Sequence, residues 1–273
     1  MKNDHVQLYP SSVRLTDPAE VQWARAELRN AFQLMGKKTW HNTTSAPTAQ
    51  PVSLHRHEVQ LLERQHFERG GVKASLKADG VRFLLLLTQW PAEKDKEVRA
   101  AALMFDRALV PYEISVWAPR HLFEGVTLLD GELVKFIGPA AAQQVDSPSM
   151  LWLAFDIMVE AGVSLANHDY DERLKRMFAV LGDDTPNITL AGSQQRRVQE
   201  CGHIVVANHD RDLQFFVKPC VDILAVRHLW DNRHGAGFQN DGILFTPVRE
   251  GVRFGKHKNM CLHPPPMKCL PIC

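Results

Sequence analysis

The stretch VKASLKADGVRFLLLLT, residues 72–88, places a lysine, an aspartate and a glycine directly before a long apolar run. Residues 81–88 are rich in Val, Phe and Leu, which is typical of a buried β-strand. Gly80 favours a turn between this strand and an earlier one at residues 72–76. The sequence therefore predicts that Lys77, Asp79 and Arg82 lie at the mouth of a buried sheet, held by a rigid backbone.

Composition limits the classes of protein that this chain can be. It has 273 residues, of which 45% are hydrophobic and 23% charged, enough for a sizeable core in one large or two small domains. A formal net charge of +1 argues against a protein that coats long nucleic acids by charge alone, although it permits a local basic groove. No apolar run approaches the ~20 residues that span a bilayer. Five cysteines without framework spacing indicate reduced thiols and an intracellular protein.

Short apolar segments separated by turn-forming or charged residues continue along most of the chain. They predict strands at residues 72–76, 81–88, 101–110, 127–137, 151–159, 213–219 and 241–248. Capping residues and apolar periodicity predict helices at residues 17–36, 169–182 and 220–232. We therefore expect an α+β protein built mainly on antiparallel sheets, with flanking helices.

Changes of composition suggest where domains begin and end. Residues 37–51 are polar and linker-like, so residues 1–48 are expected to form an N-terminal helical extension and linker. The main domain is expected at 49–260. A tail rich in proline and cysteine follows at 261–273. The last seventeen residues of the sequence contain His257, Cys261, His263, Cys269 and Cys273. Their spacing contains no C-x₂-C pair, which favours a tail without zinc.

Lys77 is a candidate nucleophile. An amine attacks only when it is neutral, and a lysine with the reference pKa of about 10.4 is almost wholly protonated near pH 7. A neighbouring cation such as Arg82, together with a bound metal, would lower the pKa of Lys77 and raise the reactive fraction. A surface lysine before a turn is the competing interpretation, because a short pattern such as KADG also arises by chance.

Acidic residues recur beside or within the apolar strands. Asp130 and Glu132 are two positions apart in LLDGELV, so their side chains share one face of the predicted strand. Asp156 lies within LAFDIMV, and Asp241 precedes the strand in NDGILFTP. Carboxylates in such places require cationic partners or a metal, although each one alone also fits a turn or a strand end.

Taken together and in this order, KADGVR, LLDGELV, LWLAFDIMV and NDGILFTP resemble the motifs of the covalent nucleotidyltransferases, which comprise polynucleotide ligases and mRNA capping enzymes. QPVSLHRHEVQLLERQ, residues 50–65, is similar to the segment that leads into the lysine motif of capping guanylyltransferases. MFDRALVPYEI and FFVKP also have counterparts there. The resemblance extends over about residues 48–260.

This resemblance implies a fold, a reaction and a set of site residues. The reaction is attack of Lys77 on the α-phosphate of GTP, followed by transfer of GMP to the diphosphate 5′ end of RNA, with Mg²⁺ or Mn²⁺ as cofactor. The implied residues and roles are Arg82 and Glu132 on the ribose, Phe155 and Ile243 around the base, Arg107 and Lys218 on the triphosphate, and Asp241 on the metal.

The sequence departs from the family pattern in its last part. Family members carry a Leu-Lys-Trp-Lys-Pro segment whose lysines contact the α-phosphate, and KNMCLHPPP stands at the equivalent place here. No segment corresponds to the C-terminal OB-fold domain that closes over the nucleotide. The family's Phe-Pro-Gly before QPVSL is replaced by APTA. These departures predict weak or absent catalysis by this chain.

Two other functions remain open at this point. An ATP-dependent RNA or DNA ligase shares the lysine motif, and the QPVSL segment favours capping over it. A non-catalytic RNA-end-binding derivative of the fold would fit the missing lysines. The resemblance also implies RNA triphosphatase, cap methyltransferase and RNA polymerase II as partners, and a nuclear location.

Overall fold

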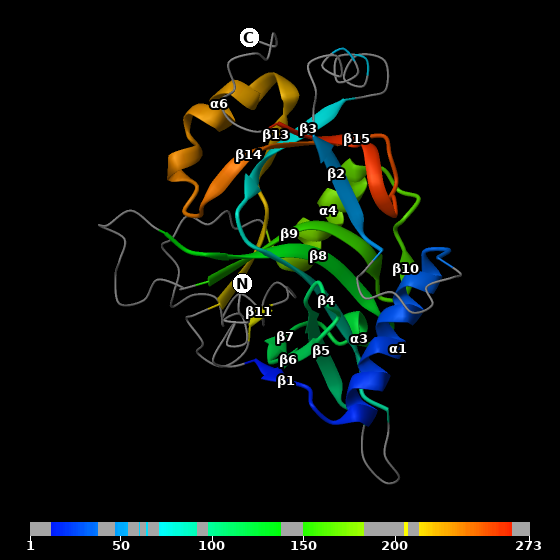
Figure 1. Ribbon diagram of the computed structural model, residues 1–273. Helices are drawn as coiled ribbons and strands as arrows, with labels where there is room; N and C mark the ends of the chain where they lie inside the picture. Colours follow the sequence, from blue (N-terminus) through cyan, green and yellow to red (C-terminus); the bar gives the residue numbers. More distant parts are fainter. Residues whose placement is uncertain are drawn as a thin grey trace.

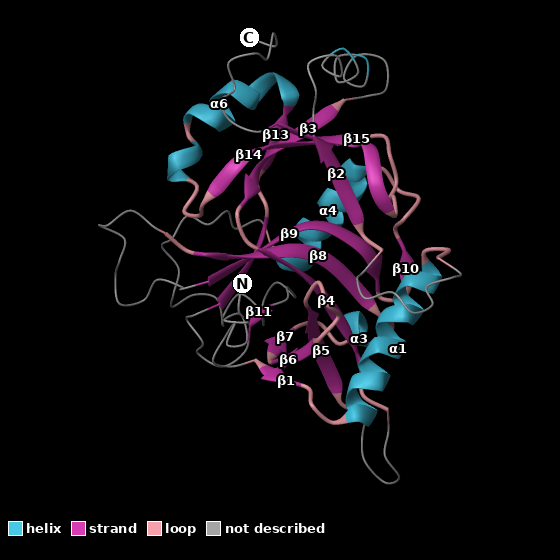
Figure 2. Ribbon diagram, viewed as in Figure 1, coloured by secondary structure: helices cyan, strands magenta, loops and turns pink. Residues whose placement is uncertain are grey.

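The computed structural model describes residues 12–37, 47–53, 60, 64, 71–91, 98–137, 150–182, 205–206 and 213–263. Most of the described chain forms strands, with helices on the outside (Figure 1 and Figure 2). The helical elements are α1 (Pro18–Leu34), α3 (His121–Glu124), α4 (Tyr170–Leu181), η4 (Ile223–Ala225), α6 (Val226–Asp231) and η5 (Arg233–Gly235). The strands are β1 (Val13–Arg14), β2 (Ala49–Ser53), β3 (Val72–Ala78), β4 (Val81–Gln89), β5 (Ala100–Phe105), β6 (Pro111–Ile114), β7 (Val116–Trp117), β8 (Thr127–Lys135), β9 (Met150–Glu160), β10 (Val163–Ser164), β11 (Val205–Val206), β12 (Leu213–Val217), β13 (Cys220–Asp222), β14 (Asn240–Pro247) and β15 (Gly255–His263).

Two larger sheets organise the protein. The first has the order β1-β6-β5-β4-β8-β9-β10, with β12 also paired to β9, and the second has the order β13-β3-β14-β15-β2. Among the described strands, all pairs are antiparallel except β12 with β9 and β15 with β2. In Figure 1 the second sheet lies above the first, and the chain passes between them where β3 leads into β4. The predicted α+β fold with mainly antiparallel sheets is confirmed.

Strand β4 lies at the centre of the first sheet, and both of its faces are apolar. It pairs with β5 on one edge and β8 on the other. Phe83, Leu85 and Leu87 belong to one core cluster, and Leu84 and Leu86 to another. A strand that is buried on both faces needs a continuous apolar run rather than an alternating one. The four consecutive leucines at residues 84–87 meet this need.

Helix α1 is part of the main body rather than a separate extension. Its N-terminus is capped by Asp17, whose side chain accepts a hydrogen bond from the Ala19 amide. Leu28 and Phe32 are fully buried in the same core cluster as Leu84. Trp23 of this helix stacks on Trp90 at the end of β4, with ring centroids 3.8 Å apart. Trp23 therefore packs against the end of the first sheet.

The helix expected at residues 220–232 is wrong in its first half. Cys220–Asp222 is the edge strand β13, which pairs with β3, and a 3₁₀ turn follows it. Asp222 caps that turn by accepting from the Leu224 amide, and the α-helix begins only at Val226. Pairing with an exposed sheet edge therefore overrides the helical pattern of CVDILA.

Other strands begin or end where local turns require it. The strand expected at 101–110 ends at Phe105, because the Asp106 carboxylate accepts from the Val110 amide and Leu109 adopts a φ of 61°. Strand β15 was not expected, and it extends to His263, beyond the boundary expected after residue 260. It pairs with β14 and with β2, so the QPVS segment is a sheet strand.

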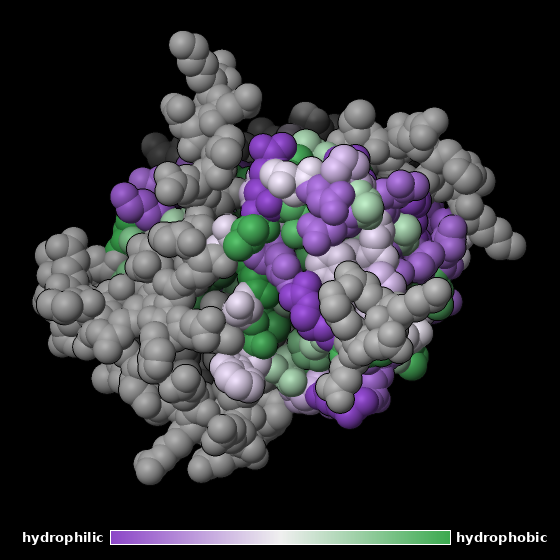
Figure 3. All heavy atoms as spheres, turned by 90° about the horizontal axis from the view of Figure 1, so that it is seen from below, coloured by the Kyte–Doolittle hydropathy of each residue, from purple (hydrophilic) through white to green (hydrophobic). Residues whose placement is uncertain are grey.

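The surface mixes charged and apolar side chains. On the face seen from below, hydrophilic and hydrophobic groups lie in small neighbouring clusters (Figure 3). Large exposed apolar side chains include Val13, Trp117 and Leu224, which lie on different elements. Within the described residues, no helix combines the length and apolar character needed to cross a bilayer.

Candidate active site

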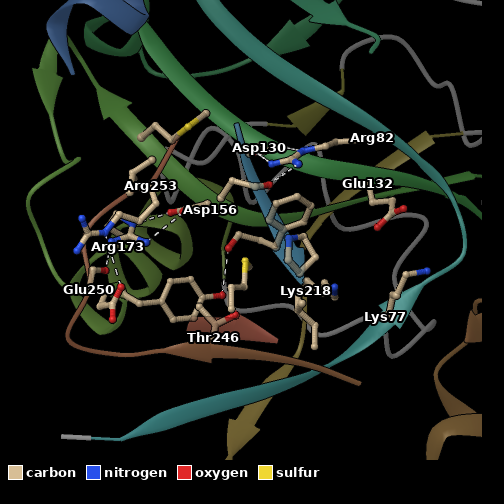
Figure 4. Close-up of a pocket in the computed structure, with 18 of the residues that line it drawn as sticks. Lys77, Arg82, Asp130, Glu132, Asp156, Arg173, Lys218, Thr246, Glu250 and Arg253 are labelled. Carbon is tan, nitrogen blue, oxygen red and sulfur yellow. Dashed lines mark hydrogen bonds and ion pairs between the residues drawn. The ribbon is translucent and has the colours of Figure 1, made fainter. Parts of the chain in front are cut away.

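A cavity of about 570 Å³ lies between the two sheets. Strands of both sheets contribute its walls, with β4, β8 and β9 on one side and β3 and β14 on the other (Figure 4). Of the residues expected in the site, the lining includes Lys77, Arg82, Arg107, Glu132, Phe155 and Lys218. The structure therefore brings together residues that are up to 141 positions apart in the sequence, from Lys77 to Lys218.

Lys77 and Asp241 meet at one end of this cavity. The Lys77 ammonium donates to both carboxylate oxygens of Asp241, at Nζ–Oδ1 and Nζ–Oδ2 distances of 2.6 and 2.7 Å. The two side chains are 32% and 53% exposed. Asp241 is thus the immediate partner of the candidate nucleophile, and both groups are accessible from solvent.

A β-bulge in β14 produces this contact. Asn240 pairs with Ala78 and Ile243 pairs with Leu76, so Asp241 and Gly242 together oppose Lys77. Gly242 has a φ of 154°, a backbone conformation that glycine adopts without strain. An extra residue in one strand bends it and re-aims the neighbouring side chain. Here the bulge directs the Asp241 carboxylate onto the amine.

Arg82 is fixed on the first sheet by Asp130. Its Nε donates to Asp130 Oδ1 at 2.8 Å, and a second nitrogen donates to Asp130 Oδ2. A third nitrogen donates to the Ala49 carbonyl of β2 at 2.7 Å. Burial would lower the pKa of Arg82, but the charge and hydrogen bonds of Asp130 outweigh it and the pKa is raised. Arg82 is therefore a permanent, oriented cation that links β4 to β2.

Glu132 and Lys218 form the inner part of the wall. Burial raises the pKa of Glu132, and the charges of Lys218 and Lys77 partly offset this effect. Lys218 is only 4% exposed, and burial lowers its pKa to about 8 although Glu132 favours the charged form. A buried lysine of this kind retains its donors for a polar group that enters the cavity. Figure 4 shows Lys77, Glu132 and Lys218 gathered at the same end.

Phe155 presents an aromatic ring to the cavity from a second bulge. Asp130 pairs with Asp156 and Gly131 pairs with Ala154, so Phe155 is the additional residue of β9. The bulge places Phe155 and Asp156, which are consecutive, on the same cavity wall. The Arg82 guanidinium and the Lys218 ammonium lie 5.3 and 5.5 Å from the ring centroid. The ring is thus held by two cations at the side of the cavity.

The opposite end of the cavity contains a buried ion pair. Arg173 of α4 binds Asp156 through both carboxylate oxygens, with distances of 2.7 and 3.1 Å. The side chain of Arg173 is 4% exposed and that of Asp156 is 17% exposed. Tyr170, Glu250 and Arg253 complete this end, which Figure 4 shows away from Lys77.

Ile243 does not line the cavity. It is fully buried in the core cluster behind β3 and β14, with Leu76 and Phe245. Leu244 and Thr246 of the same strand face the cavity instead. The bulge at Asp241–Gly242 shifts the alternation of side chains by one residue, and a shift of one residue moves every later side chain to the other face. Leu244 is therefore the apolar side chain of β14 that can contact a bound molecule.

Arg107 lies where the main cavity meets a smaller one. The smaller cavity has a volume of about 250 Å³ and is also lined by Thr48, Gln50, Arg82 and Asp106. Arg107 follows β5 in the turn that Asp106 caps. Its exposed position is compatible with an anion at the mouth, and its contact with triphosphate stays a prediction.

The residues around Lys77 are compatible with a divalent metal ion. Among the described side chains, no cluster of three or more His, Cys, Asp or Glu residues forms a complete metal site. Mg²⁺, however, is commonly bound by one or two carboxylates together with substrate phosphates. Asp241 supplies such a carboxylate, and Glu132 lies at the same end of the cavity. The side chains of the crowded C-terminal His and Cys residues lie outside the described part of the chain.

Several residues of the cavity were not expected to take part. Tyr170, Arg173 and Leu244 line it, and the motifs gave no signal for them. Asp130 and Asp156 were visible in the sequence as costly acids within strands. The structure supplies their partners, Arg82 and Arg173.

The chain is similar to mRNA-capping enzymes and to an ATP-dependent DNA ligase. The chain is 29% identical over 135 residues to the mRNA-capping enzyme subunit alpha of Schizosaccharomyces pombe, which covers 47% of this chain and 30% of that protein. It is 26% identical over 214 residues to the mRNA-capping enzyme of Danio rerio, covering 78% of this chain and 30% of that protein. Among solved structures, the ATP-dependent DNA ligase of bacteriophage T7 in complex with ATP has a TM-score of 0.45 and 13% identity, covering 80% of this chain and 68% of that one.

The chain thus spans about a third of the length of the curated relatives that it matches. The family described as mRNA capping enzyme, catalytic domain, matches residues 18–265. This range includes α1, every strand of the two large sheets except β1, and every residue of the cavity. The chain therefore belongs to the mRNA capping enzyme catalytic-domain family.

Proposed function

We propose that this domain is an mRNA guanylyltransferase that carries GMP on Lys77 between GTP and the diphosphate 5′ end of RNA. The observation that carries the proposal is the Lys77–Asp241 pair at the end of a cavity that also presents Arg82, Glu132 and Phe155. An amine, two carboxylates, a guanidinium and an aromatic ring are groups that nucleotidyl transfer needs in one place.

In the first step the Lys77 nitrogen attacks the α-phosphorus of GTP. The N–P bond forms, the P–O bond to the β-phosphate breaks, and pyrophosphate leaves. The amine must lose a proton for this attack, and the Asp241 carboxylate, at 2.6 Å, is placed to accept it. In the second step an oxygen of the RNA diphosphate attacks the same phosphorus, and the Lys77 amine is released.

A divalent ion, Mg²⁺ or Mn²⁺, would neutralise the charge that develops on the phosphates. Asp241 would hold it, with Glu132 nearby. Cationic side chains add to this effect, because Arg107 at the mouth of the cavity can contact the leaving pyrophosphate. Arg82 is oriented by Asp130 and retains N–H groups for a ribose hydroxyl, and Glu132 can accept from the same sugar.

The base would lie between Phe155 and Leu244. Leu244 replaces Ile243 in this role because it is the residue of β14 that faces the cavity. Lys218 is buried beside the Phe155 ring, so we assign its donors to the edge of the base rather than to the triphosphate expected from the sequence. A carbonyl such as guanine O6 accepts from a lysine, whereas the exocyclic amine of adenine does not.

The test is covalent labelling with nucleotide. The protein is incubated with a divalent metal and either α-labelled GTP or α-labelled ATP, and is then denatured and separated. We expect weak label, from GTP only, because KNMCLHPPP replaces the lysine segment of the family pattern. Added pyrophosphate should remove the label, which should be lost in acid but stable in alkali as for a phosphoramidate. Label from ATP only would favour a ligase, and stable GTP binding without label would favour an RNA-end-binding protein.

The proposed reaction also defines the wider setting of the protein. An RNA with a 5′ diphosphate must be supplied by an RNA triphosphatase, and the cap that results is a substrate for a methyltransferase. We infer a nuclear location, with RNA polymerase II as the source of the RNA, from the family resemblance of the sequence motifs alone.

A further inference from the structure

The first turn of α4 is bonded to both walls of the cavity. The Tyr170 amide donates to the carbonyl of Val248, directly after β14, at 2.7 Å. The Tyr170 hydroxyl donates to the carbonyl of Phe155 on β9 at 3.0 Å. One residue therefore joins the second sheet to the first sheet, at the place where each borders the cavity.

Arg173, three residues later in the same turn of α4, also connects the two walls of the cavity. Its bidentate contact with Asp156 holds β9. Another nitrogen donates to the carbonyls of His168 and Glu250, at 2.6 and 3.1 Å, and Glu250 lies in the loop after β14. Most of the N–H groups of Arg173 are thus used within the protein. Although Arg173 borders the cavity, it acts on a bound molecule through its neighbours.

The loops on either side of this turn are closely packed. The Val252 amide donates to the carbonyl of Ala166 at 2.8 Å. A Cβ atom at Gly251 would lie 2.2 Å from that same carbonyl oxygen, so only glycine fits there. The loop after β14 is therefore held against the loop before α4 by backbone contacts as well as by side chains.

Phe155 depends on this support more than an ordinary strand residue does. As the bulge residue it has no partner in the register between β8 and β9. Its carbonyl accepts from Tyr170 instead, and the Asp156 carboxylate beside it is held by Arg173. Burial raises the pKa of Tyr170 well above its usual value, so the hydroxyl stays protonated and remains a donor.

We propose that the first turn of α4 is a brace, formed by Tyr170 and Arg173, that sets the spacing between Phe155 and Leu244 and so fits the cavity to a stacked base. Both residues are positioning residues for nucleotide binding. The identity of the base as guanine rests on the proposed function. The contacts that form the brace are present without any bound nucleotide.

The experiment compares affinities for GTP and for inorganic triphosphate, which has no base. The variants are Tyr170→Phe, which removes only a hydroxyl, and Arg173→Lys. Tyr112→Phe and Arg176→Lys are the controls: Tyr112 is buried on the first sheet, and Arg176 of α4 pairs with Glu160 of β9 at 2.8 Å outside the cavity. Each brace variant should weaken GTP binding roughly three- to tenfold, the value of one hydrogen bond, and leave triphosphate binding unchanged.

Equal losses for GTP and triphosphate, or no loss of GTP binding, would overturn the proposal. Amide hydrogen exchange of residues 150–160 without nucleotide tests the brace independently of the ligand. Both brace variants should exchange faster there than both controls. If the wild-type protein binds no GTP, the proposed function fails, and hydrogen exchange then tests the brace by itself. Exchange rates of residues 150–160 that are the same in the brace variants and the controls would refute the brace.

Discussion

The two ends of the cavity each contain a lysine or arginine paired with an aspartate, but the pairs differ in burial and support. Lys77 and Asp241 are 32% and 53% exposed, and among the described residues the Lys77 amine donates hydrogen bonds only to Asp241. Arg173 and Asp156 are 4% and 17% exposed, and Arg173 is bonded to two further carbonyls. An exposed pair contributes little to stability, whereas breaking a buried one is strongly destabilising. The first pair can therefore exchange partners during a reaction, and the second maintains the shape of the site.

The largest effect is expected at the open end. Lys77→Ala should abolish covalent GMP formation, because no other amine occupies its position. Lys77→Arg should do the same, since a guanidinium does not lose its proton in proteins. Lys73→Ala is the matched control, because Lys73 lies on the same strand and pairs with Asp171 at 3.6 Å. Labelling of the Lys77 variants at the control level, measured after denaturation, would remove Lys77 as the nucleophile.

For the free energy of unfolding, a change at Arg173 should have a larger effect than a change at Lys77. Arg173→Met leaves the Asp156 charge without its partner and should lower the free energy of unfolding by about 3–5 kcal/mol. Lys77→Met breaks an exposed pair and should change it by less than about 1 kcal/mol. Urea unfolding followed by circular dichroism measures both. Similar losses in the two variants would contradict the distinction between a structural end and a reactive end.

The bulge in β14 can be tested by neighbouring substitutions. Ile243→Ala creates a cavity in the core and should lower stability by about 2–5 kcal/mol. Leu244→Ala removes an apolar contact from the open cavity, so it should chiefly weaken GTP binding. Titration of GTP against each variant, together with unfolding curves, separates the two effects. A larger loss of affinity in Ile243→Ala than in Leu244→Ala would restore the role that the sequence assigned to Ile243.

Lys218 connects stability with binding. Its pKa, lowered to about 8 by burial, lies below that of the unfolded chain, so the protonated amine destabilises the folded state at neutral pH. Lys218→Met should therefore raise the free energy of unfolding at pH 7, by on the order of 1–3 kcal/mol, and at the same time weaken GTP binding. Loss of stability in this variant would show that the charged amine is satisfied in the folded protein.

The same pKa predicts the smallest effect, a dependence of binding on pH. The Lys218 amine carries its charge below about pH 8 and loses it above. GTP affinity should therefore fall as the pH rises through about 8, while the stability of the free protein should rise. In Lys218→Met the step in affinity near pH 8 should be absent. Persistence of the step would assign it to another group.

Much of the fold follows from the sequence because β3, β4, β8, β9, β12 and β14 are marked by apolar runs with turn residues at their ends. Of the expected site residues on the first sheet, Arg82 and Glu132 lie side by side because the strand register pairs them directly. Phe155 lines the same cavity because of the bulge in β9, which the sequence did not indicate. Prediction failed where geometry depends on distant partners. Strand β15 carries a polar sequence, and its pairing with β2 is visible only in three dimensions.

The brace and the role of Leu244 were missed for related reasons. A bulge changes the alternation of side chains by one residue, and the glycine in Asp241–Gly242 is equally compatible with an ordinary turn. In the sequence, Tyr170 and Arg173 look like ordinary residues of a helix N-terminus, because Asp169 caps α4 in the usual way. Their contacts with Phe155, Asp156 and the loop after β14 arise from packing between segments that are 15 or more residues apart.

The most direct test of the central claim is to locate the covalent nucleotide by mass spectrometry. The protein is incubated with GTP and Mg²⁺ or Mn²⁺, digested under alkaline conditions, and its peptides are analysed for an added GMP. We predict GMP on Lys77 alone, with Lys73 and Lys218 unmodified. GMP on another residue, or AMP from ATP in place of GMP from GTP, would contradict the account.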